Sequence, residues 1–247
     1  MSHSRRKARL TDWASVVAGT SAIAAAAAVA LGKVPLAGAC AAVCAGAILG
    51  ARWSSQRGPS PMPYSLRWVL YLPRWPLSAH RLRVMLHPRP GERILELGPG
   101  VGIYSLPISA ALRPTGVLEV LDIQAEMLAT LQERARAAGA ENIVATLGNA
   151  QRLPYADRSF DAAYVIGVLG ELPDPDAALK EIGRVLKPGG RLVVGEALVI
   201  DPDGVRLTAL REMAARAGFM FDRRLGPGAA YFAKFSSQAA APTSITA

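Results

Sequence analysis

Apolar residues recur in two alternating patterns along residues 91–217. Short continuous apolar runs predict buried strands at residues 93–97, 117–121, 143–147, 160–166 and 191–199. Stretches with helical spacing lie between them, near residues 103–113, 124–138, 176–186 and 204–217. Strands that alternate with helices predict an α/β fold, a doubly wound and mostly parallel sheet with helices on both faces. Ligands of such sheets bind at the carboxyl ends of the strands, where the strand order reverses.

Ahead of this region the chain carries two long apolar runs without a charged residue. They are residues 13–31 and 34–51, separated only by Gly32 and Lys33. Each is about as long as the roughly 18–20 residues that cross the apolar core of a bilayer. We therefore predict an N-terminal helical transmembrane hairpin over residues 13–51. Its many small residues would let the two helices pack closely, and would also let two chains associate into an oligomer.

Basic residues flank this hairpin at both ends. Four of them lie in the tail of residues 1–12, and Arg52 and Arg57 follow the second run. The positive-inside rule then places both ends, and the domain that follows, on the cytoplasmic side of the inner membrane. Two alternatives stay open: a cleaved signal peptide, and a helical pair that is soluble or lies on the membrane surface.

The segment that follows the hairpin mixes aromatic and Arg side chains. Residues 52–63 are rich in Pro, Ser and Gly and are typical of a linker. In residues 64–90, Tyr64, Trp68, Tyr71 and Trp75 step by four, three and four residues, which would line them on one face of a helix. Beyond Pro73, Ser78 is a candidate cap for a second helix that runs to about His87. We expect an amphipathic segment at the membrane interface that covers the active site; the alternative is that the aromatic rings only pack on the catalytic domain.

The net charge of +9 belongs to the N-terminal third of the chain. Residues 1–93 hold 13 Lys and Arg residues against Asp12 and Glu92, whereas residues 94–247 are slightly acidic. Because the basic residues adjoin apolar runs, an anionic membrane surface fits them better than nucleic acid does, and no nucleic-acid partner is expected. The two cysteines and three histidines are scattered, so neither a disulfide framework nor a metal site is expected. Residues 236–247 are rich in Ala, Ser and Thr and are expected to be disordered.

Candidate chemistry begins with the glycine turn of RILELGPGVG, residues 93–102. Its spacing is G-x-G-x-G, and residue 103 is Ile where a dinucleotide fingerprint needs its third glycine. This spacing favours an adenosine-bearing cofactor other than NAD. Asp122 ends the second strand, where an acidic side chain can accept both hydroxyls of a ribose. Asn149, after the third strand, offers an amide that can read an adenine edge, beside the backbone N–H of Ala150.

Three stretches carry a family resemblance: ILELGPGVG (94–102), LDIQAEML (121–128) and the run from GNAQRLPY to GGRLVV (148–194). They resemble the class I S-adenosylmethionine-dependent methyltransferases, and most of all the type 11 branch that contains the ubiquinone/menaquinone C-methyltransferases. The resemblance covers about residues 80–235. It implies a seven-stranded, mostly parallel Rossmann-like methyltransferase domain over residues 91–235, with S-adenosylmethionine as cofactor.

The resemblance also assigns cofactor-binding residues. It implies that Asp122 holds the ribose, that Ile123 flanks the adenine, and that Asn149 and Ala150 read the adenine amino edge. The residues expected beside the methionine part are Glu96, Gly98, Pro99, Gly100 and Gly102. Ile166, at the end of the fourth strand, is also expected to bind the cofactor. Relatives usually carry Asp where Asn149 stands, and an amide oxygen can accept the same bond. RVLKPGG (184–190) is the turn before the fifth strand and a signature of the fold.

The main departure from the family is VLGELPD, residues 168–174, because many relatives carry a pair of His residues where Gly170 and Glu171 stand. Glu171 would lie beside the methyl donor and could attract a cationic acceptor or act as a base; the alternative is that it caps the next helix or bonds the backbone locally. His80 and Tyr64 are weaker candidates for a base, and so is Tyr164.

These features together predict a membrane-anchored methyltransferase that acts on a membrane lipid or a hydrophobic small molecule. The first hypothesis is N-methylation of a phospholipid amine of the phosphatidylethanolamine type, and the alternative is C- or O-methylation of a quinone or isoprenoid. Two less favoured classes are a non-catalytic cofactor-binding membrane protein and a methyltransferase of nucleic acid or protein.

Overall fold

The computed structural model describes residues 61–71, 76–198, 201 and 203–237. The chain divides into two compact units, Met1–Val69 and Leu70–Ala247. The basic tail, the hairpin predicted over residues 13–51, most of the linker and residues 238–247 lie outside the described residues. Of the helices that are described, none combines the length and the apolar character that crossing a membrane requires.

The aromatic segment after the linker forms the 3₁₀-helix η1 (Tyr64–Tyr71). A 3₁₀-helix has three residues per turn, so residues four apart point in different directions. Tyr64 therefore does not share a face with Trp68, and the single aromatic face predicted from the four-three-four spacing is wrong. Trp68 and Tyr71, three residues apart, are 41% and 54% exposed. Trp75 lies outside the described residues.

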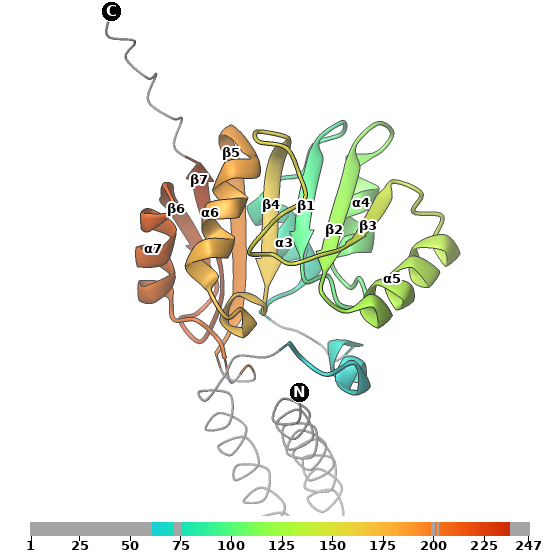
Figure 1. Cartoon of the computed structure of the whole chain (residues 1–247), viewed down its shortest axis with the longest axis horizontal. Helices are drawn as coiled ribbons and strands as arrows, with labels where there is room; N and C mark the ends of the chain where they lie inside the picture. The colour runs from blue at the N-terminus through green and yellow to red at the C-terminus, as the bar shows by residue number, and fades with distance from the viewer. Residues whose placement is uncertain (1–60, 72–75, 199–200, 202, 238–247) are drawn as a thin grey trace, which may run out of the picture. The chain divides into compact units, whose positions relative to one another are not determined.

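The second unit is built on one seven-stranded sheet, shown in Figure 1. Its strand order is β3-β2-β1-β4-β5-β7-β6, and the order reverses between β1 and β4. β7 runs antiparallel to β5 and β6, whereas the other neighbouring strands are parallel. The strands are β1 (Arg93–Leu97), β2 (Val117–Asp122), β3 (Ile143–Leu147), β4 (Phe160–Ile166), β5 (Leu186–Ala197), β6 (Phe219–Leu225) and β7 (Ala230–Ser237). The predicted doubly wound, mostly parallel sheet is confirmed.

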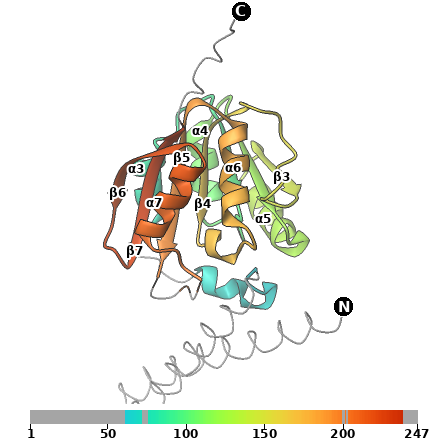
Figure 2. The same ribbon diagram turned by 60° about the vertical axis from the view of Figure 1, so that its left-hand side comes forward.

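Helices cover both faces of this sheet, as Figures 1 and 2 show. One apolar layer joins α3 (Ala79–Leu86), α4 (Ser105–Leu112) and α5 (Ala125–Ala137) to the strands. The other joins α6 (Pro175–Val185) and α7 (Leu207–Arg216) to the opposite face. A short 3₁₀-helix, η2 (Leu169–Glu171), follows β4.

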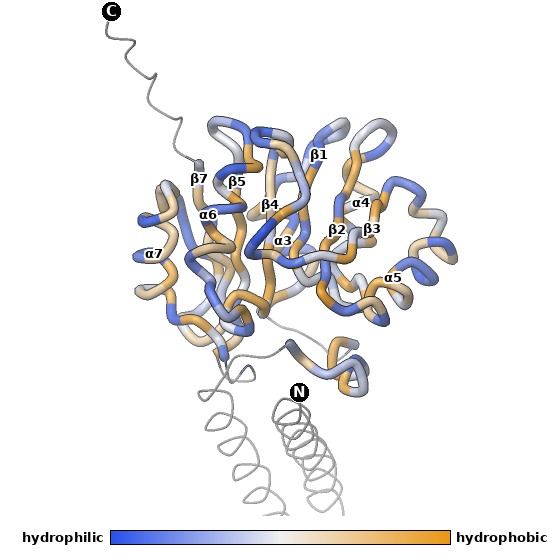
Figure 3. The backbone as a smooth tube through the Cα atoms, in the orientation of Figure 1, coloured by the Kyte–Doolittle hydropathy of each residue, from blue (hydrophilic) through white to orange (hydrophobic). Residues whose placement is uncertain are grey.

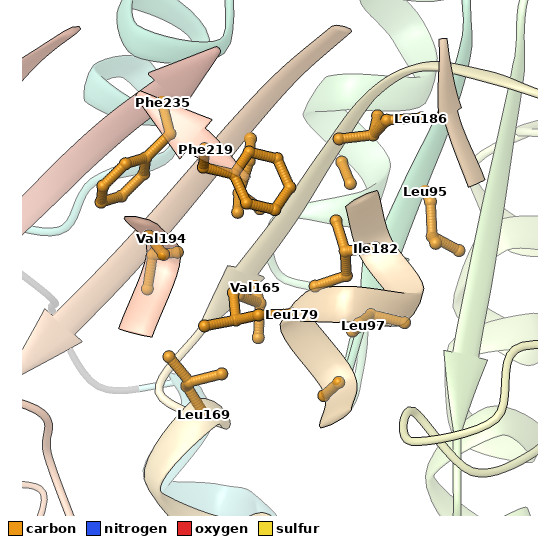
Figure 4. Packing of buried hydrophobic residues seen from close by; sticks show 14 of the residues in the cluster. Leu95, Leu97, Val165, Leu169, Leu179, Ile182, Leu186, Val194, Phe219 and Phe235 are labelled. Carbon is orange, nitrogen blue, oxygen red and sulfur yellow. The ribbon is translucent and has the colours of Figure 1, made fainter. Parts of the chain in front are cut away.

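The two layers follow from the period of two along a strand. In β1, Ile94 packs in the layer of α3 and α4, whereas Leu95 and Leu97 pack in the layer of α6. Figure 4 shows Leu179 and Ile182 of α6 lying against the side chains of the central strands. The hydropathy along the chain in Figure 3 follows the same plan, with hydrophobic residues concentrated in the central strands.

The main differences from the sequence expectations concern α3, β5 and β7. α3, expected within an interfacial segment, is part of the domain core, because Leu82, Met85 and Leu86 are buried against β5 and β7. The Ser78 cap was predicted correctly, since its Oγ accepts the backbone N–H of Arg81 at 3.3 Å. β5 begins at Leu186, so the KPGG turn lies within the strand, at an irregularity where the register against β4 shifts. β7 extends to Ser237, two residues beyond the predicted end of the domain.

Candidate active site

The glycine turn lies where the fold predicts a ligand, at the carboxyl end of β1 beside the reversal of strand order. Gly98, Gly100 and Gly102 have φ angles of 64°, 54° and 80°, a conformation that residues with a Cβ rarely adopt. Neighbouring side chains also lie close to two of these glycines. A Cβ on Gly98 would lie 2.4 Å from the Val168 side chain, and one on Gly100 would lie 2.8 Å from Leu70 Cδ1. The glycines therefore let Val168 and Leu70 pack closely on the backbone of the turn.

Glu96 is a buried carboxylate in the strand that leads into this turn, and it is only 3% exposed. The Ser105 hydroxyl donates a hydrogen bond of 2.5 Å to its Oε2. Burial raises the pKa of Glu96 to about 7; the Ser105 and Tyr164 hydroxyls oppose this rise and the charge of Asp122 adds to it. A carboxyl group of this kind is suited to binding a cation that enters the site.

Asp122 ends β2 beside the turn and is 8% exposed. Its Oδ1 accepts the backbone N–H of Gln124 at 2.9 Å. Burial raises its pKa, while backbone N–H groups of Gln124 and Gly100 favour the ionised form. The Gly100 contact ties Asp122 to the glycine turn, so the two predicted parts of the cofactor site are brought together.

The residues expected around the adenine follow β2, β3 and β4. Ile123 is 60% exposed directly after Asp122. Asn149 follows β3, and its Oδ1 accepts the N–H of Gln151 at 2.9 Å, while Ala150 is buried behind it. Ile166 ends β4 and packs against the layer of α3 and α4. The N–H of Gly148 bonds to the carbonyl of Asp122 at 2.9 Å, which holds these loops at the same edge of the sheet.

Glu171 is the last residue of η2, in the loop that leaves β4. The alternative role as a helix cap does not hold, because Asp174 caps α6 and its Oδ1 accepts the N–H of Ala177 at 2.9 Å. The loop is placed by its packing: Val168 lies on Gly98 of the glycine turn. Glu171 is thus close in sequence to a residue that touches the cofactor turn.

Two acidic residues near this loop were missed by the sequence reasoning. Glu196 in β5 is fully buried, and burial together with the charges of Asp201 and Glu171 raises its pKa well above the usual range. Asp201 follows β5, and its Oδ2 lies 3.6 Å from where a Cβ on Gly167 would stand. Glu196 sits in the apolar run RLVVGEALVI. A charged residue inside a predicted buried strand was the signal that could have revealed it.

The other candidate bases are His80, Tyr164 and Tyr64, and the structure places them in different surroundings. His80 is exposed on α3 and His87 closes that helix in a left-handed conformation, with φ of 51°. Tyr164 is 1% exposed, and burial raises its pKa well above 10, so it is not a base at neutral pH. Tyr64 belongs to the other unit, so its role stays a prediction. No group of three or more His, Cys, Asp or Glu side chains arranged to hold a metal occurs within the described ranges.

An apolar cavity adjoins the glycine turn. It has a volume of about 190 Å³, and it is bordered by Ile103 and Tyr104 directly after Gly102. The remaining lining residues are Leu70, Tyr71, Leu77, Ser78 and Ala79. An apolar group of a substrate could enter here next to the cofactor site.

Comparison with known proteins decides the family. The model of the ubiE/COQ5 methyltransferase family matches residues 75–206, more than half of the chain, including the glycine turn, Asp122, Asn149 and Glu171. The chain belongs to the ubiE/COQ5 methyltransferase family. This membership confirms the predicted enzyme class, a methyltransferase, and S-adenosylmethionine as the cofactor, which the positive-φ glycine turn and the buried carboxylates Glu96 and Asp122 fit.

Curated relatives of the family align with this chain over only part of their own length. The chain is 39% identical over 109 residues to a ubiquinone/menaquinone biosynthesis C-methyltransferase of Haemophilus ducreyi, covering 44% of this chain and 42% of that protein. It is 34% identical over 105 residues to a demethylmenaquinone methyltransferase of Bacillus cytotoxicus, covering 42% and 44%. The chain therefore spans less than half the length of these relatives.

Solved structures share the fold of this ubiE/COQ5 family member. A SAM dependent methyltransferase from Aquifex aeolicus superposes with a TM-score of 0.65 at 20% identity, covering 71% of this chain and 98% of that one. The [4+2]-cyclase SpnF superposes with a TM-score of 0.59 at 20% identity, covering 66% and 80%. A neighbour named as a cyclase shows that the fold alone does not fix the reaction, so the acceptor has to be argued from the site.

Proposed function

We propose that this protein transfers a methyl group from S-adenosylmethionine to a ring carbon, or a hydroxyl, of a hydroquinone-type molecule with an apolar tail. The observation that carries the proposal is the family match, which includes the cofactor turn, the strand ends and the loop of Glu171. The names of the relatives from Haemophilus ducreyi and Bacillus cytotoxicus point to quinone methylation. The alternative acceptor considered for the sequence is thus better supported than a phospholipid amine.

The cofactor, when bound, supplies a methyl group that is already activated on a positively charged sulfur. What remains for the chain is to hold the acceptor in line, exclude water and accept a proton. A phenol becomes a stronger nucleophile, at oxygen and at the ring carbons, as its hydroxyl proton leaves. Glu171, in the loop that packs on Gly98, is the side chain that we assign to accept this proton.

The apolar cavity beside Ile103 and Tyr104 supports an apolar acceptor. Its volume of about 190 Å³ suits a short part of an isoprenoid tail or ring rather than a whole lipid. We further propose that the sequence hairpin of residues 13–51 anchors the enzyme to the cytoplasmic membrane, where such acceptors dissolve.

A second candidate acceptor is a phospholipid amine, as the first sequence hypothesis held. It is favoured by two acidic residues, Glu171 and Asp201, whose negative charges both act on the buried Glu196. Negatively charged carboxylates in a site attract an ammonium group.

The deciding experiment offers both acceptors to the full-length protein with methyl-labelled S-adenosylmethionine. One arm contains a reduced demethyl-naphthoquinol with a short isoprenoid chain, and the other contains vesicles of phosphatidylethanolamine. Label in the naphthoquinol supports the proposal, and label in the phospholipid replaces it with the second candidate. Cofactor binding without transfer to either would contradict both.

The role of Glu171 is tested with the acceptor that is methylated. Glu171→Gln should lower kcat about 100-fold or more, because a positioned base typically contributes that factor, while the Kd for S-adenosylmethionine stays within twofold. Glu133→Gln, at an exposed position of α5, is the matched control and should leave both unchanged. Equal kcat for Glu171→Gln and the control would remove Glu171 from the proton transfer.

A further inference from the structure

Three polar side chains meet inside the apolar layer of α3 and α4. Glu96 in β1 and Tyr164 in β4 occupy paired positions in the parallel register, and Ser105 begins α4 above them. All three are buried, with exposures of 3%, 1% and 0%. The surrounding side chains, such as Leu82 and Ile108, are apolar. The carboxylate and the two hydroxyls therefore depend on one another for polar contacts.

The Tyr164 hydroxyl is not satisfied within this group. Ser105 donates to Glu96 at 2.5 Å, whereas the Tyr164 hydroxyl lies near enough to the Glu96 carboxylate for each to affect the pKa of the other but forms no well-aligned hydrogen bond with it. Buried hydroxyls are almost always hydrogen-bonded, and an exception needs an explanation. A ligand atom, or a shift of the Glu96 carboxylate when a ligand binds, would give the Tyr164 hydroxyl a hydrogen-bond partner.

The charge of Glu96 is not compensated either. The groups that act on this carboxylate are the Ser105 and Tyr164 hydroxyls and the Asp122 carboxylate, from α4, β4 and β2 respectively. None of these is a cation. Burial without a positive partner favours the protonated acid, and this is why the pKa of Glu96 stands at about 7. A cation that arrived beside Glu96 would favour the ionised form.

The methionine part of S-adenosylmethionine carries such a cation, its ammonium group. We propose that Tyr164 is a positioning residue of the cofactor site, whose hydroxyl completes the hydrogen bonding of ionised Glu96 when that ammonium group binds, so that binding expels the proton from Glu96. The proton leaves to the solvent, and no other group changes its charge. The inference needs only the cofactor and does not depend on which acceptor is methylated.

Calorimetry of cofactor binding tests this directly. The heat of binding of S-adenosylmethionine to the full-length protein is measured at pH 6.5 in two buffers that differ in ionisation enthalpy, which gives the number of protons released. We expect more than half a proton per site, because a group with a pKa of about 7 is mostly protonated at that pH. 5′-Methylthioadenosine lacks the ammonium group and should release none. Equal proton release with both ligands, or none with S-adenosylmethionine, would overturn the proposal.

A variant isolates the role of the hydroxyl. Tyr164→Phe should weaken S-adenosylmethionine about tenfold at pH 6.5 and shift the pH at which binding is half-maximal upward, while the affinity for 5′-methylthioadenosine stays the same. Tyr155→Phe is the matched control, since Tyr155 has a second buried hydroxyl without a partner in the described structure but lies away from Glu96, next to Phe160. A Tyr164→Phe protein that binds both ligands as the wild type does would overturn the proposal. If this variant does not fold, the proton release of the wild type still decides.

Discussion

At the scale of single residues, the site depends on acidic groups that are costly to bury. Glu96, Asp122 and Glu196 are the buried carboxylates nearest to the strand ends, and burial raises the pKa of each. Each therefore opposes the stability of the fold at neutral pH, while Glu96 and Asp122 are suited to a cofactor with an ammonium group and ribose hydroxyls. Stability and binding make opposite demands on the same side chains.

The Glu96 carboxyl should make the stability of the cofactor-free protein depend on pH. Its pKa rises from 4.5 in the unfolded chain to about 7 in the fold, so the folded state holds an extra proton between these values. The stabilisation that this proton gives to the folded state is complete below pH 4.5 and is lost as the pH rises through 7. Glu96→Gln should therefore gain roughly 2–3 kcal/mol over the wild type between pH 5 and pH 8, measured by urea denaturation.

The exposed Glu133→Gln variant controls for a general effect of removing a carboxylate. A wild type and a Glu96→Gln variant that respond equally to pH would show that Glu96 is ionised throughout. The same variant should lose most of its affinity for S-adenosylmethionine, because an amide carries no negative charge to attract the ammonium group.

Removing the Asp122 side chain should weaken cofactor binding and leave the fold intact. Asp122→Ala should weaken S-adenosylmethionine by roughly 10- to 100-fold, the effect of losing hydrogen bonds to a charged group. Circular dichroism should show an unchanged fold, since the side chain bonds mainly to backbone N–H groups of its own loop. Asp176→Ala, which breaks only an exposed ion pair with Arg216, is the control. An unchanged Kd for Asp122→Ala would refute the ribose assignment.

At the scale of elements, one hydrogen-bonded clamp holds the loop after β5. Glu196 in β5 pairs in register with Tyr231 in β7. Glu196 Oε2 accepts the N–H of Val205 at 3.2 Å, and the Tyr231 hydroxyl donates to the Val205 carbonyl at 2.6 Å. Both backbone groups of Val205 are thereby fixed by side chains of the sheet, which holds the loop of Asp201 near Gly167.

Breaking this clamp should loosen the loop without unfolding the sheet. Tyr231→Phe should cost about 1 kcal/mol of unfolding free energy and leave the Val205 carbonyl without a donor. Hydrogen exchange should speed up at the amides of Gly204 and Val205 and stay unchanged in β1 and β4. Tyr155→Phe removes a hydroxyl that has no partner within the described residues and should cost nothing. Equal exchange in both variants would argue against the clamp.

Sequence periodicity predicted these elements well where the apolar pattern is unambiguous. β1, β3 and β4 match the predicted bounds because their apolar runs end at Gly98, Gly148 and Gly167. The antiparallel pair β6 and β7 was not located from periodicity, since Arg223, Arg224 and Lys234 interrupt its apolar positions at the sheet edge. Pairing across strands is non-local, so neither the clamp on Val205 nor the contact of Glu96 with Tyr164 could be read from spacing. The cofactor residues were found through motif resemblance, whereas Glu196 and Asp201 required the fold.

At the scale of the whole molecule, the apolar N-terminal runs and the catalytic unit should be separable. The full-length chain should sediment with membranes, and a chain lacking residues 1–51 should remain in the supernatant, because the deletion removes both predicted spans. The Kd for S-adenosylmethionine should stay within twofold, since the described cofactor residues all lie beyond Leu70. A full-length chain found in the supernatant would contradict the membrane anchor.

The position of β7 in the sheet has a consequence for synthesis. β7 is translated after β6, yet it lies between β5 and β6 in the sheet. Until translation has passed Ser237, β5 presents an unpaired edge to the surroundings, a template on which another strand could form. The Tyr231 hydroxyl that fixes the loop beside the active site can act only after the β6–β7 hairpin has entered the sheet.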